Sequence, residues 1–397
     1  MKRLRLTAAL LAFAAAPVTA QIPGLPELPT FGESWVATAL PKLYWAGADH
    51  MGFGLLYVQM NQLGFDDWDA PEPSRATVSL DGNITTTGTK RLELALRAPK
   101  WVDGWRFYAS LEGRRDARER YFGIGNATEF DKNLESDSAP YYYRSQNTRW
   151  TARGEVQRRI VGGLRILAGI DAEQWRIDTL PGDSKLARDL AAGVDPTIGR
   201  NTGDVSGRIG LVFDTRNDEP APTRGVLLEA IFSVADSGLA GSLSYTRTTV
   251  SATGYLPLIG PLHVAGRVLG ERMSGSPRIG SYARIEAADR PFRGVGGAES
   301  NRAIPQRRLL DADKLIANLD LRYDFFEYPT LVRATAVGFV DAARVFPPGE
   351  WELTASDLAV GGGVGLFLQF GRAAILGTTA GVGPDGVIWN FHTWWPF

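Results

Sequence analysis

The chain has 397 residues, no cysteine, and 43 basic side chains against 44 acidic ones. The lack of cysteine excludes disulfides, thiolate catalysis and cysteine-based metal sites. A net charge of −1 argues against a nucleic-acid partner, because nucleic-acid binders are normally basic.

The first twenty residues have the three parts of a secretory signal peptide. Lys2, Arg3 and Arg5 are cationic, residues 6–16 are almost wholly apolar, and small residues occupy 18–20. The alternative is a membrane anchor, but a spanning helix needs roughly 20 apolar residues and this stretch is shorter. We therefore predict a signal peptide over residues 1–20.

Residues 21–47 are Pro-rich and are expected to form a tether or an N-terminal plug strand, before a barrel over 48–397. No later segment is a long uncharged apolar run. The chain is then either exported and soluble or crosses a membrane as strands, because only helices and closed barrels satisfy their backbone groups in lipid.

Apolar and polar residues alternate with period 2 over 90–98, 105–112, 164–173 and 315–325. A soluble sandwich and a membrane barrel both produce this pattern. Three features favour the barrel: the strands recur along the whole chain, they often reach ten residues, and Trp and Tyr gather near their ends.

The predicted connections are unequal in length, as in outer-membrane barrels. Short ones are expected at 161–163, 258–261, 327–330 and 371–372, and long polar ones at 125–140, 178–202 and 274–312. About fifteen strands are clear, and since bacterial barrels have an even number, we expect one more between Phe31 and Gly47. The prediction is an all-β, antiparallel transmembrane barrel of about 16 strands in the bacterial outer membrane.

The last predicted strand carries an aromatic face to the final residue, with Phe391, Trp395 and Phe397 on it. A terminal strand ending in Phe resembles the signal by which outer-membrane barrels are recognised by the barrel-assembly machinery. The alternative is a chance aromatic end on a soluble strand.

Several stretches occur in an order typical of one family. They are Arg-Tyr-Phe-Gly-Ile-Gly-Asn at 120–126, a turn with Asp214, Arg216, Pro222 and Gly225, Gly-Gly to Arg at 296–302, Gly-Phe-Val-Asp-Ala-Ala-Arg-Val at 338–345, and a Gly-rich stretch at 361–365. In this order they resemble the BamA/TamA-type superfamily of outer-membrane barrels, also called the bacterial surface antigen family.

The resemblance implies an outer loop folded into the lumen, with Arg302 paired to Asp320 and Asp341 on the twelfth and thirteenth strands. Strand parity agrees, because both aspartates alternate with apolar residues. The alternative is three solvated lumen charges, and Arg293 is a competing match for the loop arginine. Alanine follows Arg302 where the family has glycine, so a different backbone path is expected at the tip.

No nucleophile-elbow, P-loop or zinc-protease motif is present, so no catalytic residue, metal or cofactor is nominated. Family members usually carry POTRA domains, and the stretch before the predicted barrel is too short for one. The resemblance implies insertion or translocation of proteins or lipids, with outer-membrane lipids as partners and an unknown client. The alternatives are a passive pore or structural barrel, and an outer-membrane enzyme.

Overall fold

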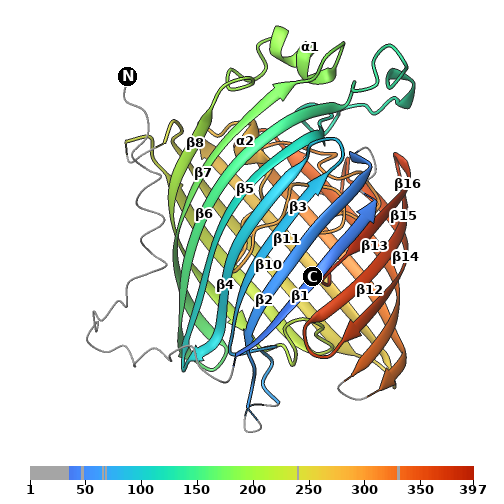
Figure 1. The fold of residues 1–397 in the computed structure, drawn as a ribbon. Helices are drawn as coiled ribbons and strands as arrows, with labels where there is room; N and C mark the ends of the chain where they lie inside the picture. The colour runs from blue at the N-terminus through green and yellow to red at the C-terminus, as the bar shows by residue number, and fades with distance from the viewer. Residues whose placement is uncertain (1–34, 46–48, 65–66, 68, 239–240, 329–330) are drawn as a thin grey trace.

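The computed structural model describes residues 35–45, 49–64, 67, 69–238, 241–328 and 331–397. Sixteen strands form one sheet in chain order, each antiparallel to its neighbours (Figure 1). The strands are β1 (Trp35–Trp45), β2 (Met51–Asn61), β3 (Ala76–Thr85), β4 (Lys90–Val102), β5 (Trp105–Arg120), β6 (Arg144–Val161), β7 (Leu164–Thr179), β8 (Thr202–Asp214), β9 (Gly225–Ala235), β10 (Tyr245–Pro257), β11 (Leu262–Gly275), β12 (Asp313–Tyr328), β13 (Val332–Phe346), β14 (Ala359–Phe370), β15 (Ala374–Gly383) and β16 (Gly386–His392). The helices are α1 (Lys185–Ala191), α2 (Ile279–Tyr282) and a 3-10 turn, η4 (Lys132–Leu134).

The predicted alternation is confirmed as an inside–outside pattern. Ile170 and Leu319 are 58% and 55% exposed, whereas their neighbours Asp171 and Asp320 are 1% and 0% exposed. Because successive side chains of a strand point to opposite faces, an apolar exterior surrounds a polar interior. This arrangement is that of a barrel whose outer face contacts lipid.

The strand that was expected between Phe31 and Gly47 is β1. The barrel therefore starts before residue 48, inside the segment expected to be a tether. Pro41 lies within β1 and is tolerated there because, among the described residues, this strand pairs on one side only, with β2. The predicted signal peptide, residues 1–20, lies outside the described residues.

The two ends of the barrel differ as predicted. The β5–β6, β7–β8 and β11–β12 connections are long, and α1 stands at this end (Figure 1), whereas β6–β7 and β10–β11 are joined by tight turns. We call the end with the long loops the outer end and the other the inner end. Across the described ranges, no helix is long and apolar enough to cross a membrane.

The ring of strands has a seam where its two ends meet. In the part of the chain that the structure describes, β1 pairs only with β2 and β16 only with β15, so no hydrogen-bonded ladder joins β1 to β16. β16 is also short, with seven residues. The seam is therefore the one place where neighbouring strands are not held by a backbone ladder.

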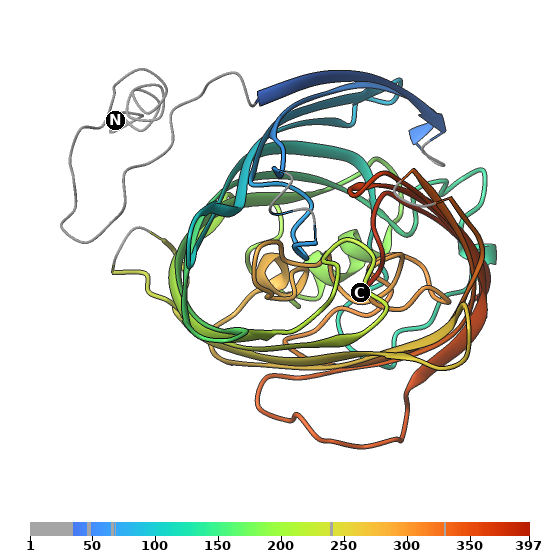
Figure 2. The same cartoon turned by 90° about the horizontal axis from the view of Figure 1, so that it is seen from below.

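The prediction that the last strand continues to Phe397 is wrong, because β16 ends at His392. The chain then turns into the lumen, and the C-terminus lies inside the ring when viewed from below (Figure 2). The Trp395 ring stacks on Phe367 with centroids 4.1 Å apart, and the Arg322 guanidinium lies 4.2 Å from the same indole centroid. Pro396 has no amide hydrogen for a ladder, so the tail gains more from these interior contacts than from extending β16.

Candidate functional site

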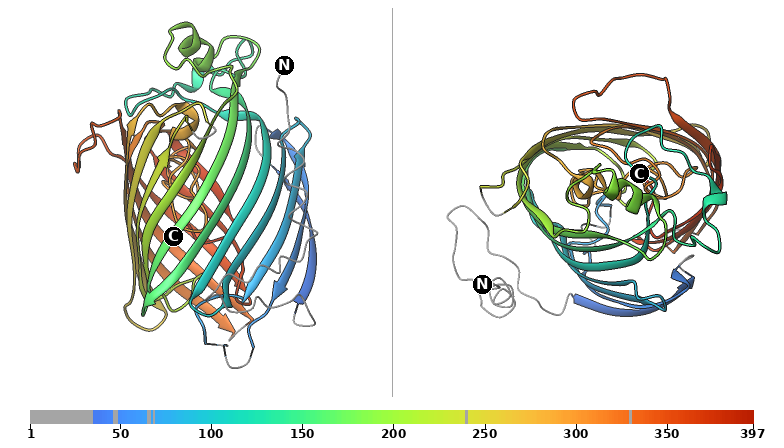
Figure 3. Two further views of the ribbon diagram at one scale, coloured as in Figure 1. Left: turned by 90° about the vertical axis from the view of Figure 1, so that its left-hand side faces the viewer. Right: turned by 90° about the horizontal axis from the view of Figure 1, so that it is seen from above.

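The connection between β11 and β12, residues 276–312, is here called the lumen loop. It runs inside the ring of strands in the views along the barrel axis (Figures 2 and 3). Val295 and Ile304 are 0% exposed and belong to an apolar cluster with side chains of β11, β12 and β13. Burial of such side chains stabilises the loop against the wall by roughly 1.5–3 kcal/mol each.

Arg302 at the tip of this loop reaches both predicted aspartates. Its Nε and Nη2 donate to Asp341 Oδ2 and Oδ1 at 2.8 and 2.7 Å, and Nη2 also donates to Asp320 Oδ1 at 2.6 Å. The backbone amide of Arg302 donates to Asp341 Oδ2 at 2.8 Å. We call these three residues the Arg302 lock, and the contacts predicted from the family resemblance are present.

The Arg302 lock is enclosed on all sides. All three side chains are at most 1% exposed, and the Phe339 ring centroid lies 4.0 Å from the Arg302 guanidinium carbon. Asn318 Nδ2 donates to Asp341 Oδ1 at 2.8 Å, and Arg322 Nη2 donates to Asp320 Oδ2 at 2.9 Å. Because solvent screens this cluster little, removing one charge leaves its partner buried and unpaired.

Two glycines in the wall, Gly361 and Gly381, leave room for the loop tip, and we call this position the seat. A Cβ on Gly361 would lie 2.3 Å from Ala303 Cβ, and one on Gly381 would lie 2.7 Å from the Arg302 carbonyl oxygen. Close approach of the loop thus explains Gly361 of the Gly-rich stretch in β14, and Gly381 of β15. Ala303 is not among the residues with positive φ, so this tip does not need glycine after the arginine.

Arg293, the competing match, lies elsewhere in the lumen. Its closest ion pair is with Glu112 of β5, at 3.6 Å from Nη2 to Oε2. The structure therefore places Arg302, and not Arg293, against Asp320 and Asp341.

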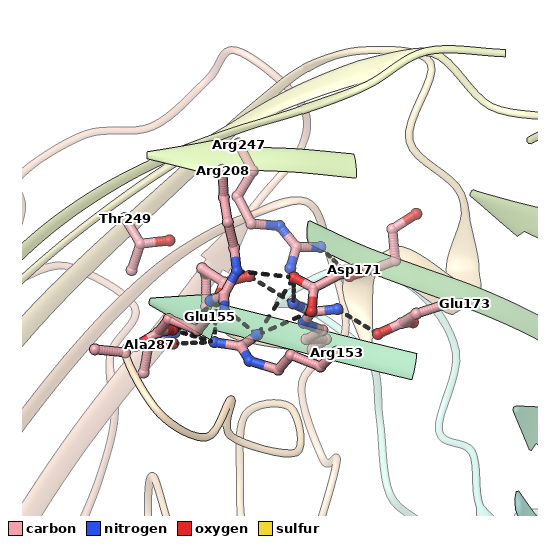
Figure 4. A network of polar contacts seen from close by, with 12 residues as sticks. Arg153, Glu155, Asp171, Glu173, Arg208, Arg247, Thr249 and Ala287 are labelled. Carbon is pink, nitrogen blue, oxygen red and sulfur yellow. Dashed lines mark hydrogen bonds and ion pairs between the residues drawn. The ribbon is translucent and has the colours of Figure 1, made fainter. Parts of the chain in front are cut away.

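A second polar cluster on the lumen loop was not predicted from the sequence (Figure 4). Arg284 Nη2 donates to Asp171 Oδ2 of β7 at 2.7 Å. Glu286 Oε1 accepts from Arg153 Nη1 of β6 at 3.0 Å and from Arg208 Nη1 of β8 at 2.9 Å. We call these five residues the cross-lumen brace, because they fix the loop to β6–β8 while its tip is fixed to β12 and β13.

Strand parity identifies Arg153, Asp171 and Arg208 as inward-facing residues, and this was the only available signal for the brace. Nothing in the local pattern indicates which loop residue reaches them. The loop conformation decides this, and it depends on contacts far apart in the sequence.

The predicted turn motif closes on itself at the inner end. Arg216 Nε and Nη2 donate to Asp214 Oδ1 and Oδ2 at 3.0 and 2.9 Å, forming a bidentate pair. Gly225 has φ of 105°, and a Cβ there would lie 2.3 Å from the Thr215 carbonyl oxygen, so glycine is required. Pro222 is buried beside Ala221, which packs against the tail residue Trp395.

The three residues proposed as the assembly signal are separated in the folded chain. Phe391 is 81% exposed on the outer face of β16, whereas Trp395 is 9% exposed. The Phe397 ring centroid lies 5.6 Å from the Arg302 guanidinium carbon. The role of these residues in assembly stays a prediction.

Sixteen antiparallel strands with an apolar exterior, unequal ends and a loop fixed inside the lumen define an outer-membrane β-barrel. A family model described as the Omp85 superfamily domain matches residues 76–375, and the chain belongs to the Omp85 superfamily. Membership places it among outer-membrane insertion and translocation barrels and not among enzymes. No curated protein sequence matches significantly.

Two solved structures show the same fold. BamA from Haemophilus ducreyi lacking POTRA domains 1–3 has a TM-score of 0.54 and 14% identity, with 90% of this chain and 69% of that chain covered. CdiB from Escherichia coli has a TM-score of 0.56 and 10% identity, with 92% of this chain covered. This chain spans 63% of the length of that CdiB chain.

Proposed function

We propose that this protein aids insertion or translocation of a client protein or lipid at the outer membrane, by releasing strands at its seam while the lumen loop holds the rest of the wall. The observation that carries the proposal is the position of the Arg302 lock. Asn390 of β16 donates from Nδ2 to the Arg302 carbonyl oxygen at 2.9 Å, so the loop tip contacts a strand that borders the seam.

The other contacts of the loop support this division. Ion pairs join it to β4 through Asp289 and Arg97 at 2.7 Å, to β5 through Arg307 and Glu119, and to β6–β8 through the brace. Among the described residues, no ion pair or side-chain hydrogen bond joins the loop to β1, β2 or β3. The first three strands are therefore the part of the wall that can move without breaking an ion pair of the lumen loop.

Strand β1 also presents the edge that such a client would use. An unpaired edge offers backbone amides and carbonyls to an incoming strand. A client strand that pairs with β1 would gain these bonds without any specific side-chain sequence. The outer-membrane lipids would contact the apolar exterior around the seam.

The experiment is to clamp the seam in the full chain, which has no native cysteine. Leu40→Cys on β1 and Trp389→Cys on β16 replace exposed side chains, 50% and 67% exposed, and a bis-maleimide long enough to span the seam would join them. We expect clamping to abolish client insertion into proteoliposomes, while the Leu40→Cys single variant treated identically keeps it. Unchanged insertion after complete clamping would contradict the proposal.

The same preparation tests the passive-pore alternative. The lumen loop and the tail fill the interior, so we expect low single-channel conductance that rises when Arg302→Glu releases the loop. Strong conductance that this charge reversal does not change would favour a passive pore.

A further inference from the structure

The inner half of the lumen holds a cavity of about 590 Å³ whose charges do not balance. It lies between the lumen loop and the segments that fold into the inner end, among them the C-terminal tail. Its lining contains the arginines 97, 106, 153, 165, 216, 267 and 290, against the carboxylates of Glu93, Asp214, Glu219, Glu229 and Asp289 and the α-carboxylate of Phe397, the last residue. A cavity of this size holds a small organic ligand.

Five of the seven arginines are accounted for by ion pairs. Each of them has a carboxylate oxygen within 3.0 Å; they are residues 97, 106, 153, 216 and 290. Two arginines, Arg165 and Arg267, have no such partner. The excess positive charge of the cavity is therefore at these two positions.

Arg267 of β11 is 4% exposed and touches neutral acceptors only. Its donors go to Asn318 Oδ1 at 2.8 and 2.9 Å, to the Glu299 carbonyl at 2.6 Å and to the Pro396 carbonyl at 3.2 Å. Among the described aspartates and glutamates, none forms an ion pair with its guanidinium within 4.0 Å. A buried cation without a close Asp or Glu partner is unfavourable, and a bound anion would offset this.

Arg165 of β7 is the second cation without a close partner. Its single ion pair among the described residues is with Asp214 Oδ2 at 4.0 Å, and its buried Nη1 has no hydrogen-bond partner. Tyr255, which also lines the cavity and is 5% exposed, donates its hydroxyl to no described residue. These groups are donors, and a phosphate group offers the acceptors that arginine binds best.

The rest of the lining is mixed, with hydroxyl and amide side chains beside apolar and aromatic ones. Met60, Leu96, Phe292, Trp394 and Phe397 contribute to the apolar part, partly from β2 and partly from the tail that follows β16. β16 borders the seam, and β2 is one strand away from it, behind β1. The cavity thus combines two guanidinium groups that lack a close Asp or Glu carboxylate with apolar side chains.

We propose that this cavity binds an anionic, phosphate-bearing amphiphile, with Arg165, Arg267 and Tyr255 holding the phosphate and the tail aromatics contacting the apolar part. Glu229 also lines the cavity and has no cationic partner among the described residues. Its oxygens accept from Ser251 Oγ at 2.9 Å and from the Ala288 amide at 3.0 Å, so its negative charge opposes binding of an anion. Arg165 and Arg267 together outweigh it. The inference does not rest on the proposed function, because the cavity is present with the loop in place.

The test is calorimetric titration of the full chain in a non-ionic detergent, with Trp fluorescence as a second readout. The probes are dihexanoyl phosphatidic acid, dihexanoyl phosphatidylcholine and inorganic phosphate. We expect saturable binding of the phosphatidic acid, with phosphatidylcholine and inorganic phosphate each binding at least about tenfold more weakly. Failure of phosphatidic acid to bind, or equal binding of phosphatidylcholine, overturns the proposal. Equal binding of inorganic phosphate overturns the part of the proposal in which the tail aromatics contact the apolar part of the ligand.

Variants separate this cavity from non-specific adsorption. Arg165→Gln and Arg267→Gln should each weaken binding of phosphatidic acid about ten- to hundredfold, because each removes a charged donor. Glu229→Gln should strengthen binding, and Arg176→Gln, on an exposed arginine paired with Asp178 at the outer end of β7, should leave it unchanged. If Arg267→Gln fails to fold, Arg165→Gln decides the result, since Arg165 makes no hydrogen bond to the described residues; unchanged binding there refutes the assignment.

Discussion

Removing Arg302 should destabilise the folded barrel far more than removing an exposed arginine. Its side chain makes three charge-assisted hydrogen bonds of 2.6–2.8 Å to two aspartates that are 0% exposed. After Arg302→Ala, Asp320 keeps Arg322, but among the described residues the only remaining side-chain donor to Asp341 is the neutral amide of Asn318. Breaking a buried pair in this way costs about 3–5 kcal/mol.

The double variant tells this pairing apart from simple loss of packing. In Arg302→Ala/Asp341→Asn the buried negative charge is also removed, so we expect it to be less destabilised than the sum of the singles by about 2–3 kcal/mol. The assay is equilibrium urea unfolding of the detergent-folded barrel, followed by Trp fluorescence and heat-modified gel mobility. The matched control is the exposed Arg176–Asp178 pair, 47% and 25% exposed, whose coupling should stay below about 1 kcal/mol. Additive losses at Arg302 and Asp341 would refute the reasoning.

The remaining predictions concern the seat, the tail, the brace and the outer end of the loop. Gly381→Ala should unseat the tip and speed protease cleavage of the lumen loop, whereas Gly338→Ala, whose Cβ meets nothing within 4 Å, should not; equal cleavage rates would argue against the seat. Trp395→Ala should free the tail and make the remaining Trp side chains more accessible, so that acrylamide quenches their fluorescence more than the loss of one indole explains. Quenching that the lost indole fully explains would contradict this prediction. Glu286→Gln should weaken the brace and increase conductance in planar bilayers by several-fold, and wild-type conductance would count against a brace. Burial raises the pKa of Asp311, in the loop outside the strands, to about 6. Because the folded state then binds the proton more tightly than the unfolded state, the free energy of unfolding should fall by at most about 3 kcal/mol between pH 4 and 7. Asp311→Asn should remove this pH dependence in urea titrations.

The period-2 alternation of apolar and polar residues was sufficient to predict the barrel, which side chains of each strand face inward, and most of the connections. Asp320 could be assigned to the interior because Leu319 and Leu321 occupy the opposite face, and the family resemblance supplied its partner Arg302. β1 was found only by counting, because Pro41 and its two-sided exposure obscure the alternation.

The sequence pattern did not reveal how the lumen is filled. The brace joins Arg284 and Glu286 to three strands more than 70 residues away in the sequence. The tail likewise has the sequence pattern of a continued β16, and only the position of Phe367 inside the barrel shows where Trp395 packs instead. Both features depend on three-dimensional packing that local alternation does not encode.

The account depends most on the lumen loop being held inside the barrel by its tip. Hydrogen–deuterium exchange of the folded protein in detergent measures this directly, because the Arg302 amide donates to Asp341 and the Gly297 amide to Asn301 at 2.9 Å. We predict that amides of residues 296–304 exchange as slowly as those of β13 and speed up by orders of magnitude in Arg302→Ala. Exchange of this segment in the wild-type protein as fast as that of the exposed connection around α1 would contradict the account.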